Sequence, residues 1–164
     1  MSKLVARGAA FAFAVAAAAQ PGAAQLGPDA AACRAGNRPA ILVNVSGFKA
    51  RSGNVRVNVY ANADTFLDRG RYIRQINLPV SAAAMPVCVA LPRPGRYAVA
   101  VRHDVSGNGN DWGDGGGFSR NPRLSLTNLR PSFETVAFNV GGGLQPTSVV
   151  LNYRFGLSIR PVRG

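Results

Sequence analysis

The chain has 164 residues, of which 47% are hydrophobic and only 16% are charged. This length is typical of one domain, and this composition excludes a disordered chain. The formal net charge of +12 predicts a surface that attracts anions.

The first residues have the organisation of a cleavable export signal. Lys3 and Arg7 form a short positive region, and an uninterrupted apolar stretch covers residues 8–19, which is too short to span a membrane comfortably. Small residues precede Gln20 and Gln25, so we expect cleavage near residue 19 or 24, which makes residues 1–24 a signal peptide. A retained amphipathic anchor is the alternative. No second hydrophobic run follows, so the mature protein is expected in the periplasm or outside the cell, and not as an integral membrane protein.

Export changes how the two cysteines are interpreted, because an oxidising compartment lets a pair persist as a disulfide. Cys33 and Cys88 are the only cysteines, and we predict that they are bonded, with residues 25–39 forming an N-terminal strap. Two separate buried thiols are the alternative. With two cysteines and one histidine, a zinc site with the usual nitrogen and sulfur ligands is excluded.

Apolar residues with period two, separated by Gly, Pro, Asn and Asp, predict strands with one buried face. The first two strands, residues 40–47 and 53–61, are expected to pair as a hairpin, because the polar connection ends in Gly53-Asn54 and so has the chemistry of a turn. The stretch 62–74 breaks the alternation and is interpreted as a loop or a single helical turn.

Strand character returns at residues 72–80 and 85–91. In the second of these, Cys88 lies on the face opposite the apolar row, so the disulfide is expected outside the main core. Residues 96–103 form the clearest strand, and His103 shares the phase of its apolar row.

From residue 104 to residue 131 the alternation is almost absent, which predicts one long loop rich in Gly, Asp and Asn. Two closing strands are expected at residues 134–140 and 147–153, and the basic tail, residues 154–164, is expected to be only partly ordered. About seven strands without intervening helices predict a single antiparallel β-sandwich over residues 40–153, immunoglobulin-like or prealbumin-like. A closed barrel is the alternative.

Residues 95–104 (GRYAVAVRHD) and 107–110 (GNGN) form the most distinctive sequence of the chain. Together with other landmarks in the same order and spacing, they resemble the secreted domain of unknown function 2141 family. The other landmarks are the opening segments 43–47 and 53–57, the triplet 117–119 and the triplet 131–133. The resemblance covers roughly residues 40–153 and implies a β-sandwich-like exported domain without an established activity.

The segment 104–114 holds three of the seven acidic residues of the chain. Oxygen-bearing side chains at alternate positions, with a glycine at the sixth, are the layout of a calcium loop. The twelfth position is Gly115 where a bidentate glutamate is expected, so an ordinary turn built from Asp, Asn, Ser and Gly is the alternative. Calcium is the only cofactor that the sequence indicates. The candidate ligands are Asp104, Ser106, Asn108, Asn110, Asp111 and Asp114.

Trp112 is the only tryptophan and lies in the same loop, near Phe118. Its position is compatible with a binding aromatic and with an aromatic that folds back over the edge of the core. The cost of exposing a large apolar side chain favours the second interpretation. His103, Trp112 and Phe118 are the candidate binding residues around this loop.

Catalysis is not expected, and the one alternative is a small envelope hydrolase or transferase centred on His103 and Ser119. Asp104 cannot assist His103, because adjacent strand residues point to opposite faces, and the triplet 117–119 lacks the final glycine of a nucleophile elbow. His103 is therefore expected to be a buried structural residue with satisfied hydrogen bonds.

The sequence as a whole predicts an exported, non-catalytic binding or interaction module of the cell envelope. Its partner is expected to be an unidentified protein or an anionic envelope component, and a merely solvated basic surface is the alternative. The arginines are scattered along the chain without an aromatic stacking motif, which argues against nucleic acid as the partner.

Overall fold

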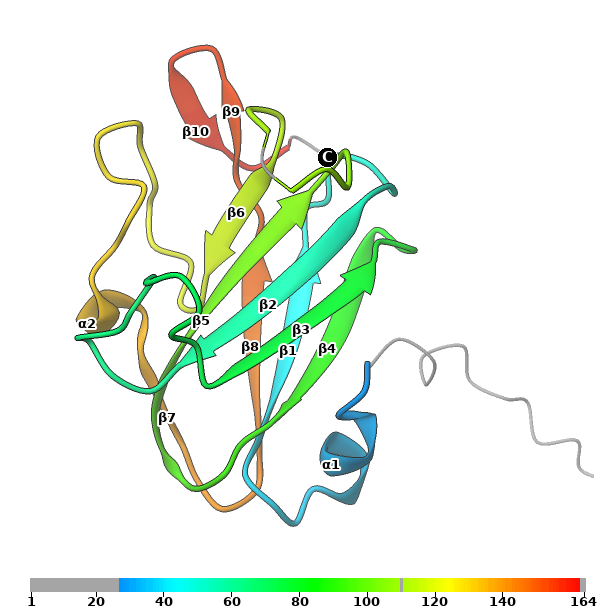
Figure 1. The fold of residues 1–164 in the computed structure, drawn as a ribbon, viewed down its shortest axis with the longest axis vertical. Coiled ribbons are helices and arrows are strands. Elements are labelled where there is room, and N and C mark those ends of the chain that lie inside the picture. The colour runs from blue at the N-terminus through cyan, green and yellow to red at the C-terminus, as the bar shows by residue number, and fades with distance from the viewer. Residues whose placement is uncertain (1–26, 110, 163–164) are drawn as a thin grey trace, which may run out of the picture.

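Two packed β-sheets form the fold, with short helices at their margins (Figure 1). The structure is a computed structural model that describes residues 27–109 and 111–162. The predicted all-β sandwich is confirmed, and the predicted signal peptide lies outside the described residues. In chain order the elements are α1 (Ala30–Ala35), β1 (Ala40–Ser46), β2 (Asn54–Tyr60), β3 (Arg74–Pro79), β4 (Ala84–Ala90), β5 (Gly95–Asp104), β6 (Gly115–Phe118), α2 (Phe133–Val136), β7 (Phe138–Val140), β8 (Leu144–Val150), β9 (Tyr153–Phe155) and β10 (Ser158–Arg160).

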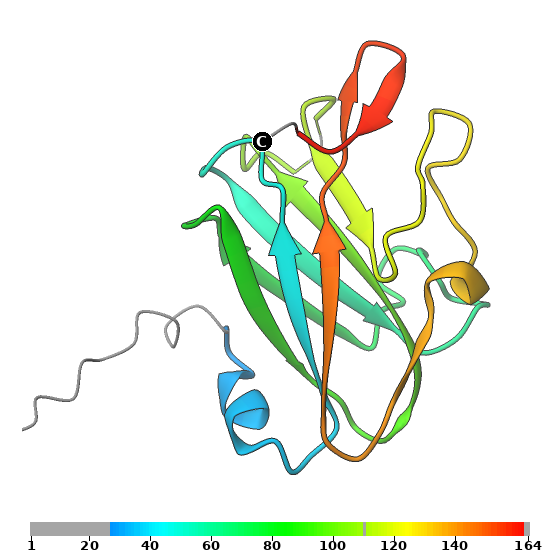
Figure 2. The same cartoon turned by 180° about the vertical axis from the view of Figure 1, so that it is seen from behind.

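The strand order is β4-β1-β8 in one sheet and β3-β2-β5-β6 in the other, with β7 pairing with the first residues of β5. Figure 2 shows the first sheet from behind, with β1 between its two neighbours. β1 is antiparallel to β4 but parallel to β8, so the expectation of a wholly antiparallel sandwich is wrong at this pair. The chain passes through the other sheet before it returns as β8, and such a long connection permits a parallel neighbour.

The core lies between the inward faces of the two sheets. Alternate residues of each strand point inward, as period two requires, and the valines and isoleucine of β1 and β2 are completely buried. Burial of each such side chain contributes roughly 1.5–3 kcal/mol. The main rows are Ile41, Val43 and Val45 from β1, Val55, Val57 and Val59 from β2, Met85, Val87 and Val89 from β4, and Tyr97, Val99 and Val101 from β5.

β1 and β2 lie in different sheets and do not form the predicted hairpin. Their connection crosses the edge of the sandwich and ends at Gly53, which has a φ of 68°. A Cβ atom at Gly53 would lie 1.8 Å from the carbonyl oxygen of Asp104, so the turn chemistry serves a crossing between layers instead of a hairpin. An alternating pattern shows that a strand has one buried face, but it does not specify the partner strand.

The segment 134–140 begins with the helical turn α2, and only its last residues form the strand β7. The hydroxyl of Ser132 accepts the N–H of Thr135, which is the arrangement of a helix N-cap. The predicted strand 147–153 is divided between β8 and β9. No helix within residues 27–109 and 111–162 is long and apolar enough to cross a membrane.

Two segments expected to lack strands contain them. The long loop after β5 includes β6, whose sequence Gly-Gly-Gly-Phe shows no alternation. The C-terminal tail forms the antiparallel pair β9 and β10. Both segments lie at the same end of the sandwich (Figure 1).

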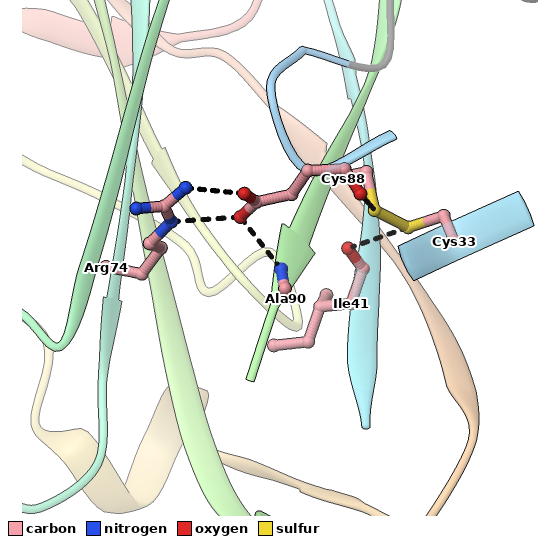
Figure 3. The surroundings of a disulfide bond; sticks show 6 residues. Cys33, Ile41, Arg74, Cys88 and Ala90 are labelled. Carbon is pink, nitrogen blue, oxygen red and sulfur yellow. Dashed lines mark hydrogen bonds and ion pairs between the residues drawn. A yellow bond between two sulfur atoms is a disulfide. The ribbon is translucent and has the colours of Figure 1, made fainter. Parts of the chain in front are cut away.

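The predicted disulfide joins Cys33 of α1 to Cys88 of β4, with the two Cα atoms 6.0 Å apart (Figure 3). Together with Ala40 the two cysteines form a small apolar cluster that is separate from the main core. This agrees with the expectation that the strap lies on the outer face of the sheet.

Asp29 fastens the same strap to both sheets through Arg74 and Ala90, which are labelled in Figure 3. Its carboxylate accepts hydrogen bonds from Nε of Arg74 in β3 at 2.9 Å and from the N–H of Ala90 in β4 at 3.0 Å. Burial alone would raise the pKa of Asp29, but these bonds and the charge of Arg74 outweigh burial and lower the pKa below its usual value. Because β3 and β4 belong to different sheets, one carboxylate links the two layers.

The outer face of the sheet β3-β2-β5-β6 is partly covered by α2 and the loop after β2. These segments form a second apolar cluster that includes Phe118 of β6, and a hollow remains beside Gly115 and Gly116 of the same strand. The cluster consists of Tyr60, Ala98, Phe118, Leu124, Phe133, Val136 and Ala137.

Candidate functional site

His103 is completely buried and all of its polar atoms have partners. Its Nε2 lies 2.9 Å from the carbonyl oxygen of Ser52, and its Nδ1 lies 2.6 Å from the hydroxyl of Tyr153. A carbonyl group can only accept, so Nε2 carries the proton and the Tyr153 hydroxyl donates to Nδ1. Burial raises the pKa of Tyr153 to about 12, which keeps that hydroxyl protonated. The structure gives His103 the structural role predicted for it and removes it from the surface.

Ser119 is also buried, and its hydroxyl is used by the backbone. The hydroxyl donates to the carbonyl of Val136 at 2.7 Å and accepts the N–H of Val99 at 3.0 Å. Val99 precedes His103 by four residues on β5, so His103 and Ser119 are roughly 13 Å apart at the rise of a strand. The structure does not bring together the two residues on which the hydrolase alternative depended.

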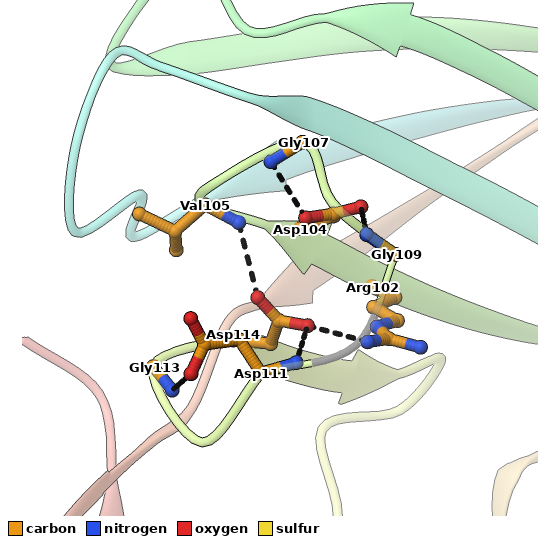
Figure 4. Close-up of polar contacts among 8 residues, drawn as sticks. All are labelled: Arg102, Asp104, Val105, Gly107, Gly109, Asp111, Gly113 and Asp114. Atoms are coloured by element: carbon orange, nitrogen blue, oxygen red, sulfur yellow. Dashed lines mark hydrogen bonds and ion pairs between the residues drawn. The ribbon is translucent and has the colours of Figure 1, made fainter.

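Asp104 holds the start of the loop after β5 (Figure 4). One carboxylate oxygen accepts the N–H of Gly107 and the other accepts the N–H of Gly109, both at 2.8 Å. Aspartate commonly stabilises a turn by bonding its own backbone a few residues on. The side chain of Asp104 therefore folds the loop locally.

Asp114 closes the same loop from its other end (Figure 4). Its carboxylate accepts the N–H groups of Val105 at 3.1 Å and of Asp111 at 3.0 Å, and it forms an ion pair with Arg102. Burial would raise the pKa of Asp114, but the bonds from Arg102 and from the two N–H groups lower it below its usual value. Asp114 is thus held as a carboxylate whose oxygens serve the protein itself.

The predicted calcium ligands are only partly gathered by this loop. Asn110 lies outside the described residues, and the side chains of Ser106 and Asn108 are exposed. Asp111 accepts the N–H of Gly113 at 3.2 Å. Within the described part of the chain no three His, Cys, Asp or Glu side chains are grouped so that they could hold a metal ion. The calcium site remains a prediction.

Trp112 projects into solvent with 80% of its surface exposed, so the expectation that it covers the core edge is wrong. The guanidinium of Arg154 lies 4.5 Å from the centre of the indole ring, a distance at which a cation and an aromatic face attract. Nε of Arg154 also donates to the carbonyl of Gly156 at 3.0 Å. The bonds of Asp114 shape the loop so that Trp112 turns outward, where Arg154 stacks on it.

A groove of about 240 Å³ lies beside Trp112, between β6, the β9-β10 pair and the loop that follows β6. On that loop, Leu126 and Leu129 are 38% and 48% exposed. We call this surface the Trp112 groove; the residues that define it are Trp112, Phe118, Leu126, Leu129, Arg154 and Ile159. Phe118 is mostly buried and forms part of its wall. A shallower hollow of about 720 Å³ continues the groove past Ile159.

The C-terminal tail contributes to this groove, although its sequence was not expected to form part of a site. Arg154 and Ile159 belong to β9 and β10, in a segment expected to be only partly ordered. Phe155, Leu157 and Ile159 alternate around Gly156, and this short period-two pattern around a glycine is the signal that indicates a hairpin.

Comparison with known families matches residues 43–148 to a family described as "Uncharacterized protein conserved in bacteria (DUF2141)". The matched region begins in β1 and ends in β8, so it includes strands of both sheets and the loop after β5 that Asp104 and Asp114 hold. Comparison with curated proteins and with solved structures finds no match. The family match covers more than half of the chain, and the chain therefore belongs to the uncharacterised bacterial family DUF2141.

Proposed function

We propose that this protein is an exported, non-catalytic binding module of the cell envelope, and that the Trp112 groove holds its ligand. The observation that carries the proposal is the 80% exposure of Trp112 beside leucines that are themselves exposed. A contiguous exposed apolar surface with a few polar groups is typical of a binding site. The guanidinium of Arg154 stacks on the indole beside this groove, which favours a site that is formed before any ligand arrives.

The charges around the groove favour an anionic ligand. Arg123, Arg154 and Arg160 border the groove and its continuation, and within the described residues none of them forms an ion pair with a carboxylate. Asp111 and Asp114 also line the groove. The charge of Asp114 is matched by Arg102, so three arginines stand against the one remaining carboxylate, that of Asp111. Guanidinium groups bind carboxylate and phosphate oxygens well. We therefore expect a ligand that combines an apolar body with an anionic group.

The proposed location rests on the N-terminal sequence, which resembles an export signal. The Cys33–Cys88 bond supports it, because disulfides persist in oxidising compartments. Anionic lipids and glycans of the bacterial envelope are the ligands that such a basic exported protein would meet first.

Fluorescence of Trp112 tests the proposal, because this residue is the only tryptophan and lies at the site. The mature protein is titrated with lipid, polysaccharide and peptidoglycan fractions of a bacterial envelope, and the emission spectrum is recorded. We expect one fraction to shift the emission saturably. Leu129→Ala, which removes apolar surface from the groove, should weaken that binding by a factor of about ten.

Leu144→Ala is the matched control, since Leu144 lies on β8 in the other sheet and is 37% exposed. This variant should bind as tightly as the wild type. The proposal is wrong if no fraction changes the emission, or if Leu144→Ala weakens binding as much as Leu129→Ala does.

A further inference from the structure

Two arginines face each other on the outer face of the sheet β3-β2-β5-β6. Arg56 of β2 and Arg102 of β5 are directly opposite in the antiparallel register, and like charges in this position repel. Arg102 is paired with Asp114. Arg56 has no ion pair within the described residues.

The Nε atom of Arg56 is buried and has no hydrogen-bond partner, and no other buried side-chain nitrogen or oxygen in the described part of the chain is in this state. Buried polar atoms in native proteins are almost always paired with protein groups, water or a ligand, so this atom requires an acceptor that the protein itself does not supply. The exception here is a donor on a cation. The missing partner is therefore an acceptor, and an anionic acceptor would also offset the repulsion from Arg102.

A hollow of about 330 Å³ gives access to these groups. Arg56, Arg102, Asn58 and Tyr60 line it, above the small residues of β5 and β6. We call it the arginine hollow. Two guanidinium groups against the single carboxylate of Asp114 leave it with one positive charge. The planar fork of a guanidinium matches the two oxygens of a carboxylate or phosphate group.

The glycines of β6 connect the arginine hollow with the Trp112 groove. A Cβ atom at Gly115 would lie 2.4 Å from the ring of Tyr153, and one at Gly117 would lie 2.7 Å from the side chain of Val149. Packing therefore requires both of these glycines. A Cβ atom at Gly116 would meet nothing closer than a carbonyl oxygen at 3.8 Å, so packing does not require the third.

Gly116 lines both the arginine hollow and the Trp112 groove. A bare position on a strand often marks the close approach of a ligand. Here it leaves the surface of β6 without a side chain at a position that both depressions share.

We infer that the arginine hollow is an anion subsite of this protein. It binds the carboxylate or phosphate group of an amphiphilic ligand whose apolar body crosses β6 at Gly116 and lies in the Trp112 groove. This inference rests on the proposed function and adds the class of ligand, an amphiphilic anion, and the position of its charged group.

Three probes with the same octyl chain test the subsite: octyl phosphate, octanoate and the uncharged octyl glucoside. Binding to the mature protein is measured by calorimetry below the critical micelle concentration of each probe. We expect at least one of the two anions to bind about ten-fold more tightly than octyl glucoside. The comparison between octyl phosphate and octanoate shows whether the subsite prefers a phosphate or a carboxylate.

Arg56→Gln should remove the preference for the anion, so that octyl phosphate and octanoate bind no more tightly than octyl glucoside. Arg38→Gln removes the same charge from an exposed position between α1 and β1, and it should keep the preference. Thermal melting checks that both variants fold, and Arg56→Gln should not destabilise the protein, because it relieves the repulsion between Arg56 and Arg102. Gly116→Leu should weaken the binding of all three probes, because its side chain would lie where the apolar body crosses β6.

The inference is wrong if the three probes bind equally, if none binds, or if the preference survives in Arg56→Gln. If Gly116→Leu binds the probes as tightly as the wild type does, the apolar body of the ligand does not cross β6 at Gly116. The proposed function is tested separately, by the envelope fractions and Leu129→Ala. Binding in the Trp112 groove can therefore be established even if these probes show that the arginine hollow is not an anion subsite.

Discussion

At the scale of single residues, the same amino acid has opposite constraints at neighbouring positions of β6. Gly115 and Gly117 point toward the core, where the ring of Tyr153 and the side chain of Val149 occupy the space of a Cβ atom. Gly116 points away from the core. Core packing does not require a glycine at this position, so its lack of a side chain is explained by the two surface depressions that it lines.

Alanine substitutions in β6 separate these two constraints. Gly115→Ala should lower the free energy of unfolding by about 1–3 kcal/mol, because it overpacks the core. Gly116→Ala should leave it unchanged or raise it by up to about 1 kcal/mol, because it reduces backbone entropy in the unfolded chain. Urea unfolding measures both. Equal destabilisation by the two variants would contradict the assignment of Gly116 to the surface.

Asp104 supports a second prediction at this scale. Asp104→Ala removes the acceptor of two backbone N–H groups, so it should destabilise the protein by about 1–3 kcal/mol, with calcium and with a chelator alike. Thermal melting under both conditions measures this. A rise in melting temperature with calcium that Asp104→Ala abolishes would instead establish the calcium loop.

At the scale of elements, periodicity predicted strands wherever one face is buried and the other is not. The residues of β1, β2 and β5 alternate and were located within a residue or two. Their partners could not be predicted, because the valine rows of β1 and β2 look alike whether the strands pair side by side or pack face to face. β6 was missed because glycine has no side chain to alternate.

The candidate site was predicted only in part, because a sequence pattern does not show which distant segments meet in the fold. The loop after β5 was identified by its composition, but its depressions are formed by distant segments. Arg56, Leu129 and Arg154 come from three separate parts of the chain, and only the fold brings them to β6. The outward position of Trp112 depends on the bonds of Asp114 and on the tail, which the sequence did not place.

Asp29 gives a prediction for the strap as an element. Its pKa in the folded protein lies below the ordinary value of 3.8, so its stabilisation is present above the unfolded pKa and is lost as pH falls through the folded value. Asp29→Asn should therefore cost about 1–3 kcal/mol at pH 7, and the difference from the wild type should shrink below about pH 4.

Urea unfolding at pH 7 and at pH 3 measures this difference. Glu134→Gln is the control, because Glu134 forms an exposed ion pair with Arg96 and exposed pairs contribute only about 0–1 kcal/mol. A difference between Asp29→Asn and the wild type that stays constant with pH would show that the carboxylate does not fasten the strap.

At the scale of the whole molecule, α1 and the β9-β10 pair lie at opposite ends of the β-sandwich (Figure 1). A disulfide fastens α1 to the sandwich, and depressions edged with arginine lie at the end with β9 and β10. The strap stabilises the fold at one end. In the proposed function, the end with β6, β9 and β10 binds the ligand.

Export and the disulfide can be tested together on the protein as the cell produces it. Intact mass and N-terminal sequencing should give a mature chain that begins near Gln20 or Gln25 and has no free thiol. Reduction should lower the free energy of unfolding by on the order of 4 kcal/mol, since the bond closes a long loop. A chain that keeps residues 1–24 in the cytosol, with both thiols free, would contradict the proposed location.

The proposed function requires that Trp112 is exposed in the free protein and is covered when a ligand binds. Quenching of its fluorescence by iodide measures this most directly, because iodide is an anion and Arg154 lies against the indole. We predict strong quenching in the free protein and several-fold weaker quenching once the envelope fraction that shifts the emission is bound, because a bound ligand covers the indole. A tryptophan already shielded in the free protein, or one equally quenched with that fraction bound, would contradict the proposed function.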